Sequence, residues 1–68
     1  MMTGRIGRIV RAQSCGFIDG EDGNDYVFRQ DALHDISFDD LYEGAVVTFE
    51  VVMGSHELRA EMVRLVRS

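Results

Sequence analysis

The chain has 68 residues, of which 46% are hydrophobic, and its seven arginines, absent lysines and twelve acidic residues give a formal net charge of −5. This length supports one hydrophobic core and excludes a second, so we expect a single domain over residues 1–68. The chain is too apolar for intrinsic disorder and lacks the run of about 18 apolar residues that a membrane helix needs, which excludes both classes.

The first part of the chain predicts three strands. Residues 4–10 combine Ile, Val and Arg and form the first strand, in which Gly7 marks a bulge or a close backbone approach. Residues 15–18 form a short second strand. Residues 19–25 are rich in Asp and Gly, which favours a turn, so residues 26–28 should pair back as the third strand of a hairpin.

The second part predicts a loop and two more strands. Residues 31–42 indicate a short helical turn within a long loop, and residues 45–53 carry the best strand pattern of the chain. A period of two places three of its apolar residues on one face: Val47, Phe49 and Val51. Residues 57–66 suit a strand or a helix, and we interpret them as a fifth strand. Because closure removes exposed strand edges, we expect an all-β, five-stranded antiparallel barrel of the OB type.

The charges are distributed unevenly along the chain. Residues 1–18 hold three arginines and no acid (+3), residues 19–50 hold one arginine and ten acids (−9), and residues 51–68 hold three arginines and two acids (+1). An acidic total argues against nucleic-acid binding, because arginine and lysine neutralise phosphates. The distribution instead allows a basic face beside acidic loops, although acidic residues also populate solvated turns for backbone reasons alone.

The potential metal ligands and nucleophiles are isolated in the sequence. His34 and His56 have no neighbouring ligand at metal-site spacing, and Cys15 has no partner motif. We therefore expect no metal site, no cofactor and no enzymatic activity. The lone cysteine excludes an internal disulfide, and no apolar signal region follows residues 1–5, so we expect a cytoplasmic protein.

A series of residues keeps a characteristic spacing over most of the chain. It comprises Gly16-Phe17-Ile18, a Gly-containing acidic turn, Asp25 to Leu33, Phe38, Leu41, Glu43-Gly44, Val47 and Phe49. In this series the chain resembles the bacterial cold-shock domain, in a register without gaps from Gly4 to Gly54. The resemblance implies an OB-type barrel that binds single-stranded RNA or DNA and serves RNA chaperoning or the regulation of transcription or translation.

The residues that the family uses for binding are altered here. Cold-shock domains stack bases on exposed aromatic rings of the second and third strands, within a basic groove. The family's first-strand Lys-Trp is replaced by Gly7-Arg8, its Lys-Gly-Phe-Gly-Phe by residues 13–17 (Gln-Ser-Cys-Gly-Phe), and its Val-Phe-Val-His-Phe by residues 26–30 (Tyr-Val-Phe-Arg-Gln). Several rings and two lysines are thereby lost, which predicts weak binding that decreases steeply with salt.

The resemblance assigns the following binding residues to this sequence: Arg8, Phe17, Val27, Arg29 and Phe38. Strand alternation directs Val27 and Arg29 to the binding face and turns the neighbouring rings of Tyr26 and Phe28 inward. Phe17 and Phe38 keep aromatic positions, but Phe38 is equally well explained as a hydrophobic anchor of its loop. Arginine can both stack on a base and pair with phosphate, whereas Arg5 and Arg11 are interpreted as solvated edge residues.

A second hypothesis keeps the barrel but changes its ligand. Cys15 and Val27 replace aromatic residues, which makes the same face flatter and more aliphatic, as a protein interface requires. In this alternative the face contacts a protein partner or forms a homodimer.

Overall fold

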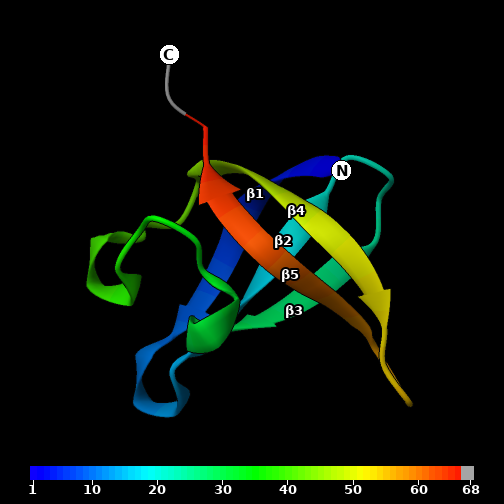
Figure 1. Cartoon of the computed structure of the whole chain (residues 1–68), viewed down its shortest axis with the longest axis horizontal. Coiled ribbons are helices and arrows are strands. Elements are labelled where there is room, and N and C mark those ends of the chain that lie inside the picture. Colours follow the sequence, from blue (N-terminus) through cyan, green and yellow to red (C-terminus); the bar gives the residue numbers. More distant parts are fainter. Residues whose placement is uncertain (67–68) are drawn as a thin grey trace.

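Five strands and three short 3-10 turns follow one another in the computed structural model, which describes residues 1–66 (Figure 1). In chain order they are β1 (Met2–Val10), η1 (Arg11–Gln13), β2 (Cys15–Gly20), β3 (Asp25–Arg29), η2 (Gln30–Ala32), η3 (Phe38–Asp40), β4 (Val46–Met53) and β5 (Leu58–Leu65). All five predicted strands are present, including the fifth. The predicted domain extends to Ser68, and its last two residues, 67–68, lie outside the described residues.

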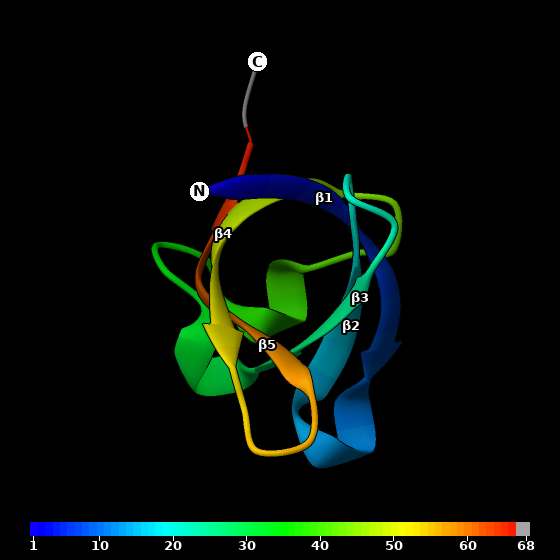
Figure 2. The same cartoon turned by 90° about the vertical axis from the view of Figure 1, so that its right-hand side faces the viewer.

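The strands close into a barrel in the order β1-β2-β3-β5-β4, and Figure 2 shows the ring that they form. The predicted all-β, five-stranded barrel of the OB type is confirmed, except that it is not antiparallel throughout. Its strand orientation is mixed, because β3 and β5 run parallel while the other four neighbouring pairs are antiparallel. A closed ring with an odd number of strands cannot alternate direction throughout, so closure itself requires a parallel pair.

The core lies inside this ring and is built from alternate residues of the strands. Ile6, Ile18, Phe28, Val47 and Val63 are almost completely buried. The hairpin between β2 and β3 buries Tyr26 as well as Phe28, as the alternation predicted, and the Tyr26 ring packs at 5.0 Å from that of Phe49, measured between ring centroids. The other side of β2 and β3 is therefore free to carry polar and aromatic residues toward solvent.

The prediction for β4 is wrong at one residue. Val47 and Phe49 are buried as expected, but Val51 is 43% exposed. The register between β4 and β5 shifts between Thr48 and Glu50, so β5 contains a bulge at this point. Val51 is exposed although its partner on β5, Ala60, is completely buried. A period of two gives the face of a residue, but it does not indicate how deeply that residue is buried.

Two glycines shape the β1–β2 part of the sheet. The register between β1 and β2 shifts between Ile6 and Arg8, which confirms the bulge predicted at Gly7. At Gly16, a Cβ atom would lie 2.7 Å from the Phe28 ring and 2.6 Å from the Arg8 carbonyl oxygen. Only glycine allows the ring and the neighbouring strand to approach β2 this closely.

Candidate functional site

The outward surface of β1, β2, β3 and β5 is ordered in rows of directly paired residues. One row crosses the four strands, because Arg8 pairs with Phe17, Phe17 with Val27, and Val27 with Arg59. Paired residues of neighbouring strands direct their side chains to the same side of a sheet. The structure thus brings together three of the five residues predicted for the site, and Arg29 lies in the next row, opposite Cys15.

Phe17 lies at the centre of this surface, where its side chain borders two shallow hollows. One hollow, of about 300 Å³, is lined by Gly7, Arg8, Phe17, Asp19 and Asp25. The other, of about 250 Å³, is lined by Gln13, Cys15, Phe17, Val27, Arg29 and Glu57. With 37% of its surface exposed, the Phe17 ring can be covered by a flat ligand without a change in the backbone. We call the residues of the two hollows, together with Arg59, the β1–β3 face.

The two ends of the β1–β3 face differ in their charged residues. The pair Asp19 and Asp25 lies opposite Arg5 at the end next to the β2–β3 turn. Arg29 lies at the other end, where β3 finishes. The first end thus carries two carboxylates against one guanidinium, whereas at the second end Arg29 shares its hollow with Glu57, so the face is more acidic beside the β2–β3 turn.

The guanidinium groups of Arg8 and Arg29 have no bonded partner among residues 1–66. Both side chains are exposed, and neither forms a hydrogen bond or an ion pair with another described residue. They differ in this respect from Arg5 and Arg11, which were interpreted as solvated edge residues. Arg5 donates a hydrogen bond to the Gly44 carbonyl oxygen at 3.4 Å.

Arg11 and Phe38 form a contact on a different side of the barrel. Arg11 donates to the Leu41 carbonyl oxygen at 3.3 Å, and its guanidinium carbon lies 5.9 Å from the centroid of the Phe38 ring. Phe38 is only 6% exposed and belongs to the core cluster. The assignment of Phe38 to the binding surface is corrected accordingly, because η3 packs the ring into the barrel as an anchor for the loop.

Arg59 extends the central row of the β1–β3 face and was not indicated by the sequence. It is half-buried, and its Cδ lies 3.1 Å from the position that a Cβ on Gly54 would occupy, so its aliphatic stem lies over the β4–β5 turn. Its place beside Val27 depends on the parallel pairing of β3 with β5, two strands that are far apart in the sequence. Only a correct prediction of that pairing could have identified it.

The acidic turn between β2 and β3 is held by one carboxylate. Asp22 accepts hydrogen bonds from the Asn24 backbone N–H at 3.1 Å and from the Tyr26 hydroxyl at 2.5 Å. These bonds lower the pKa of Asp22, the tyrosine hydroxyl contributing most, and the same bond raises the pKa of Tyr26. The turn is therefore ordered by Asp22, and it holds the acidic end of the β1–β3 face in place.

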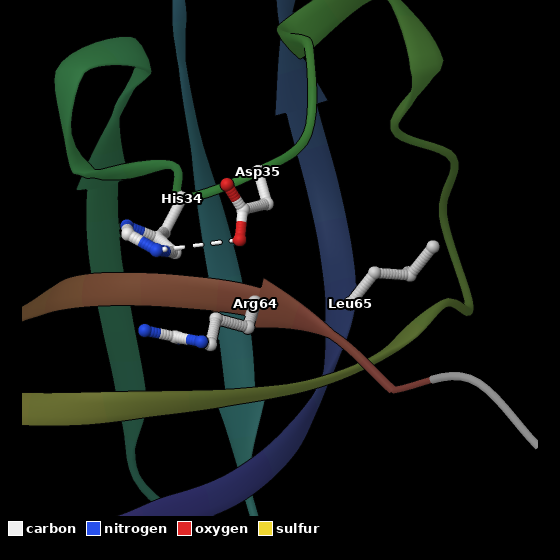
Figure 3. A pocket seen from close by; sticks show the side chains of 4 residues that line it. All are labelled: His34, Asp35, Arg64 and Leu65. Carbon is white, nitrogen blue, oxygen red and sulfur yellow. Dashed lines mark ion pairs between the residues drawn. The ribbon is translucent and has the colours of Figure 1, made fainter.

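A further hollow lies elsewhere, between the loop after η2 and the end of β5 (Figure 3). It measures about 360 Å³ and is lined by His34, Asp35, Arg64 and Leu65. His34 Nε2 lies 3.3 Å from Asp35 Oδ2, and the His34 backbone N–H donates to the Val63 carbonyl oxygen at 2.8 Å. This hollow shares no residue with the β1–β3 face.

Residues 1–66 contain neither a metal-binding cluster nor a membrane-spanning helix. No three His, Cys, Asp or Glu side chains there are arranged to hold a metal ion. None of the helical segments in this part of the chain has the length and apolar character needed to cross a membrane.

Comparison with known proteins gave no match, either to a protein-family model or to a curated protein.

Proposed function

We propose that this barrel is a non-catalytic, cold-shock-like module that binds single-stranded RNA or DNA on its β1–β3 face. The observation that carries the proposal is the position of Phe17, an exposed ring flanked on one surface by the guanidinium groups of Arg8 and Arg29, which have no bonded partner within residues 1–66. The resemblance of residues 4–54 to the cold-shock domain, whose binding surface lies on the same strands, supports it further.

The chemistry of the β1–β3 face suits a flexible single strand. A base can stack on the Phe17 ring, and an arginine on either side can lie flat against a neighbouring base or donate to a phosphate. Val27 supplies an apolar surface next to the ring. A duplex does not expose the faces of its bases, so this arrangement favours unpaired strands.

The proposed binding is weak and depends strongly on salt. The face offers one exposed aromatic ring, Phe17, where the family's platform has several, and each stacked base contributes about 1–3 kcal/mol. Its cations are arginines alone, and the carboxylates of Asp19 and Asp25 border the same surface. Neutralising two or three phosphates of a single strand gives a slope of about −1.4 to −2 in a plot of log affinity against log salt.

Titration of a labelled oligopyrimidine at low salt, followed by fluorescence anisotropy, tests the proposal. We expect Phe17→Ala to weaken binding by roughly 5- to 150-fold, which corresponds to about 1–3 kcal/mol. Arg29→Ala should weaken binding and make the salt slope shallower. Arg64→Ala is the matched control, since it removes an exposed arginine outside the β1–β3 face.

Absence of binding at high micromolar protein, or equal effects of Arg29→Ala and Arg64→Ala, would refute the proposal. Amide chemical-shift mapping locates the ligand independently. Shifts confined to β2 and β3 on addition of the oligonucleotide support the nucleic-acid function. The alternative of a protein interface on the same face is favoured by two results together. The amide shifts of β2 and β3 do not change on addition of the oligonucleotide, and the protein binds a protein partner that the Phe17→Ala variant does not bind.

The cellular roles that we propose follow from the same resemblance. A weak, sequence-tolerant binder of single strands acts as an RNA chaperone or as a regulator of transcription or translation. Cys15 is a free thiol on the β1–β3 face, which fits the reducing conditions of the cytoplasm, the compartment we propose.

A further inference from the structure

The outer half of β4 is a strand with one unpaired edge. Residues 50–53 pair with β5 on one side, from Glu50 opposite Glu61 to Met53 opposite Leu58. On the other side, the pairing with β1 ends at Met2 opposite Phe49. Backbone N–H and C=O groups of alternate residues point to each edge of a strand, so within residues 1–66 this edge has unpaired donors and acceptors. Figure 1 shows the β4–β5 turn projecting beyond the other strands.

The same segment is apolar and exposed. Val51 is 43% exposed, Val52 41% and Met53 77%. Proteins usually protect a free edge with a lysine, a proline or an inward-pointing charge, and the Val-Val-Met sequence of residues 51–53 contains none of these. An unprotected apolar edge is suited to strand addition, in which a second extended chain completes the hydrogen bonding of the sheet.

We propose that a second copy of this chain covers the edge, by antiparallel pairing of residues 50–53 with the same residues across a two-fold axis. The edge requires a partner that is extended and apolar, and residues 51–53 of a second copy meet both requirements. When the pairing is centred on Val52, each Val51 faces the other copy's Met53 and each Glu50 faces Gly54. No two like charges are then directly opposed across the new interface.

Pairing at this edge also joins the β1–β3 faces of the two copies. On the outward side, Val52 is paired with Arg59, which is paired with Val27. The row that starts at Arg8 therefore continues to the β4 edge and across it into the second copy. The association itself does not depend on nucleic-acid binding, because it uses residues 50–53 and not the hollows around Phe17.

Salt should have opposite effects on dimerisation and on nucleic-acid binding. Each copy carries a formal net charge of −5, so two copies repel each other and added salt screens that repulsion. We therefore expect dimerisation to strengthen as salt is raised from about 0.05 M to about 0.5 M. Nucleic-acid binding weakens over the same range.

Sedimentation equilibrium of the free protein, from about 10 μM to about 1 mM, tests this interface. We expect a dimer fraction that increases with concentration and with salt. Val52→Lys and Met53→Lys place a charge on the edge and should leave the protein monomeric. Tyr42→Lys introduces the same charge at another exposed residue and should leave dimerisation unchanged. Circular dichroism confirms that each variant retains its sheet.

A strictly monomeric protein over the whole range overturns the proposal. The proposal is also overturned if the Val27→Lys variant is monomeric while the Val52→Lys variant still dimerises, because the β1–β3 face would then be the interface. The register is tested with Val52→Cys in a Cys15→Ala background. Symmetric pairing at residue 52 brings the two thiols within disulfide reach and gives an oxidised dimer in high yield, whereas Tyr42→Cys in the same background should not. Equal yields from both variants would contradict the proposed pairing.

Discussion

Two pairs of arginines differ in what their guanidinium groups contact: Arg8 and Arg29 of the β1–β3 face, and Arg5 and Arg11 next to residues 41–44. Arg5 and Arg11 donate to backbone carbonyl oxygens of that segment. Arg8 and Arg29 lie exposed beside the hollows around Phe17, without such a partner among the described residues.

This difference shows why the net charge of a small domain is a poor guide to its partners. An arginine that already holds a loop contributes to stability, and moving it to a phosphate would break existing contacts. An arginine without a partner breaks no protein contact when it binds an anion, and gives up only bound water and side-chain freedom. Two exposed guanidinium groups beside an aromatic ring can therefore matter more than a formal excess of carboxylates in loops and turns.

The largest effect that we predict is on oligonucleotide affinity, which should depend on Arg8 and Arg29 much more than on Arg5 and Arg11. The double variant Arg8→Ala/Arg29→Ala should lose about 30-fold in affinity, from about 1 kcal/mol for each charge-assisted contact. The double variant Arg5→Ala/Arg11→Ala removes the same charge and should lose only a few-fold, through the weaker general field. Anisotropy titrations at one low salt concentration measure both.

Because the two double variants have the same net charge, their difference reports position and not total charge. Equal losses would show that the barrel attracts nucleic acid only as a diffuse electrostatic field. The salt slope provides a second readout, since it should become shallower by about 0.7 for each phosphate contact removed from the face.

The second predicted effect is on the free energy of unfolding, for which Arg11 should matter more than Arg8. Arg11→Ala removes the hydrogen bond to Leu41 and the contact with the Phe38 ring, and should lower the free energy of unfolding by about 1 kcal/mol. Arg8→Ala should change it by no more than about 0.5 kcal/mol, as is usual for exposed residues without contacts. Urea unfolding of both variants measures the difference, and equal values would contradict the structural role of Arg11.

Residues close together in the sequence were predicted well. The alternation in β2 and β3 correctly separated the buried Tyr26 and Phe28 from the outward Val27 and Arg29. It succeeded because the side-chain direction in a strand depends on local backbone geometry alone. The acidic turn was also recognised, because Asp and Gly favour turns through their own backbone preferences.

The errors concern residues whose environment is set by distant parts of the chain. Phe38 was given two interpretations, a stacking residue and a hydrophobic anchor, and only the structure decides for the anchor, because η3 folds the ring into a core built by other elements. Val51 was placed on one face with Val47 and Phe49, but it is exposed whereas they are buried. Arg59 was missed, because its place next to Val27 arises only when the barrel closes through the parallel β3–β5 pair.

The third prediction concerns the acidic end of the β1–β3 face and its dependence on pH. Hydrogen bonds from the Tyr26 hydroxyl and the Asn24 N–H lower the pKa of Asp22 in the folded protein. A lowered folded-state pKa stabilises the fold above the ordinary carboxyl pKa near 4, and this contribution is lost as the pH falls through the lowered value. Urea unfolding over a series of pH values should show this loss, and Asp22→Asn should reduce it.

The hydrogen bond between Tyr26 and Asp22 also makes stability depend on pH in the alkaline range, where stability is lost as the pH rises. It raises the pKa of Tyr26, so its contribution is complete below the ordinary tyrosine pKa near 10 and is lost as the pH rises through the raised value. Tyr26→Phe should therefore remove part of both pH dependences. An unchanged acid profile in both variants would show that the turn is held by other contacts.

The smallest effect that we predict lies on β5, outside both arginine regions. Glu61 is paired directly with Glu50 of β4, so two like charges face each other across the strands. Glu61→Lys replaces repulsion by attraction and should raise the free energy of unfolding by about 0.2–1 kcal/mol, the usual range for cross-strand pairs. Glu21→Lys makes the same charge change in the exposed β2–β3 turn and serves as the control. Urea unfolding at low salt should show a gain for Glu61→Lys that exceeds the gain for Glu21→Lys and shrinks at high salt. Equal gains would mean that reducing the net charge, and not this pair, is what stabilises the barrel.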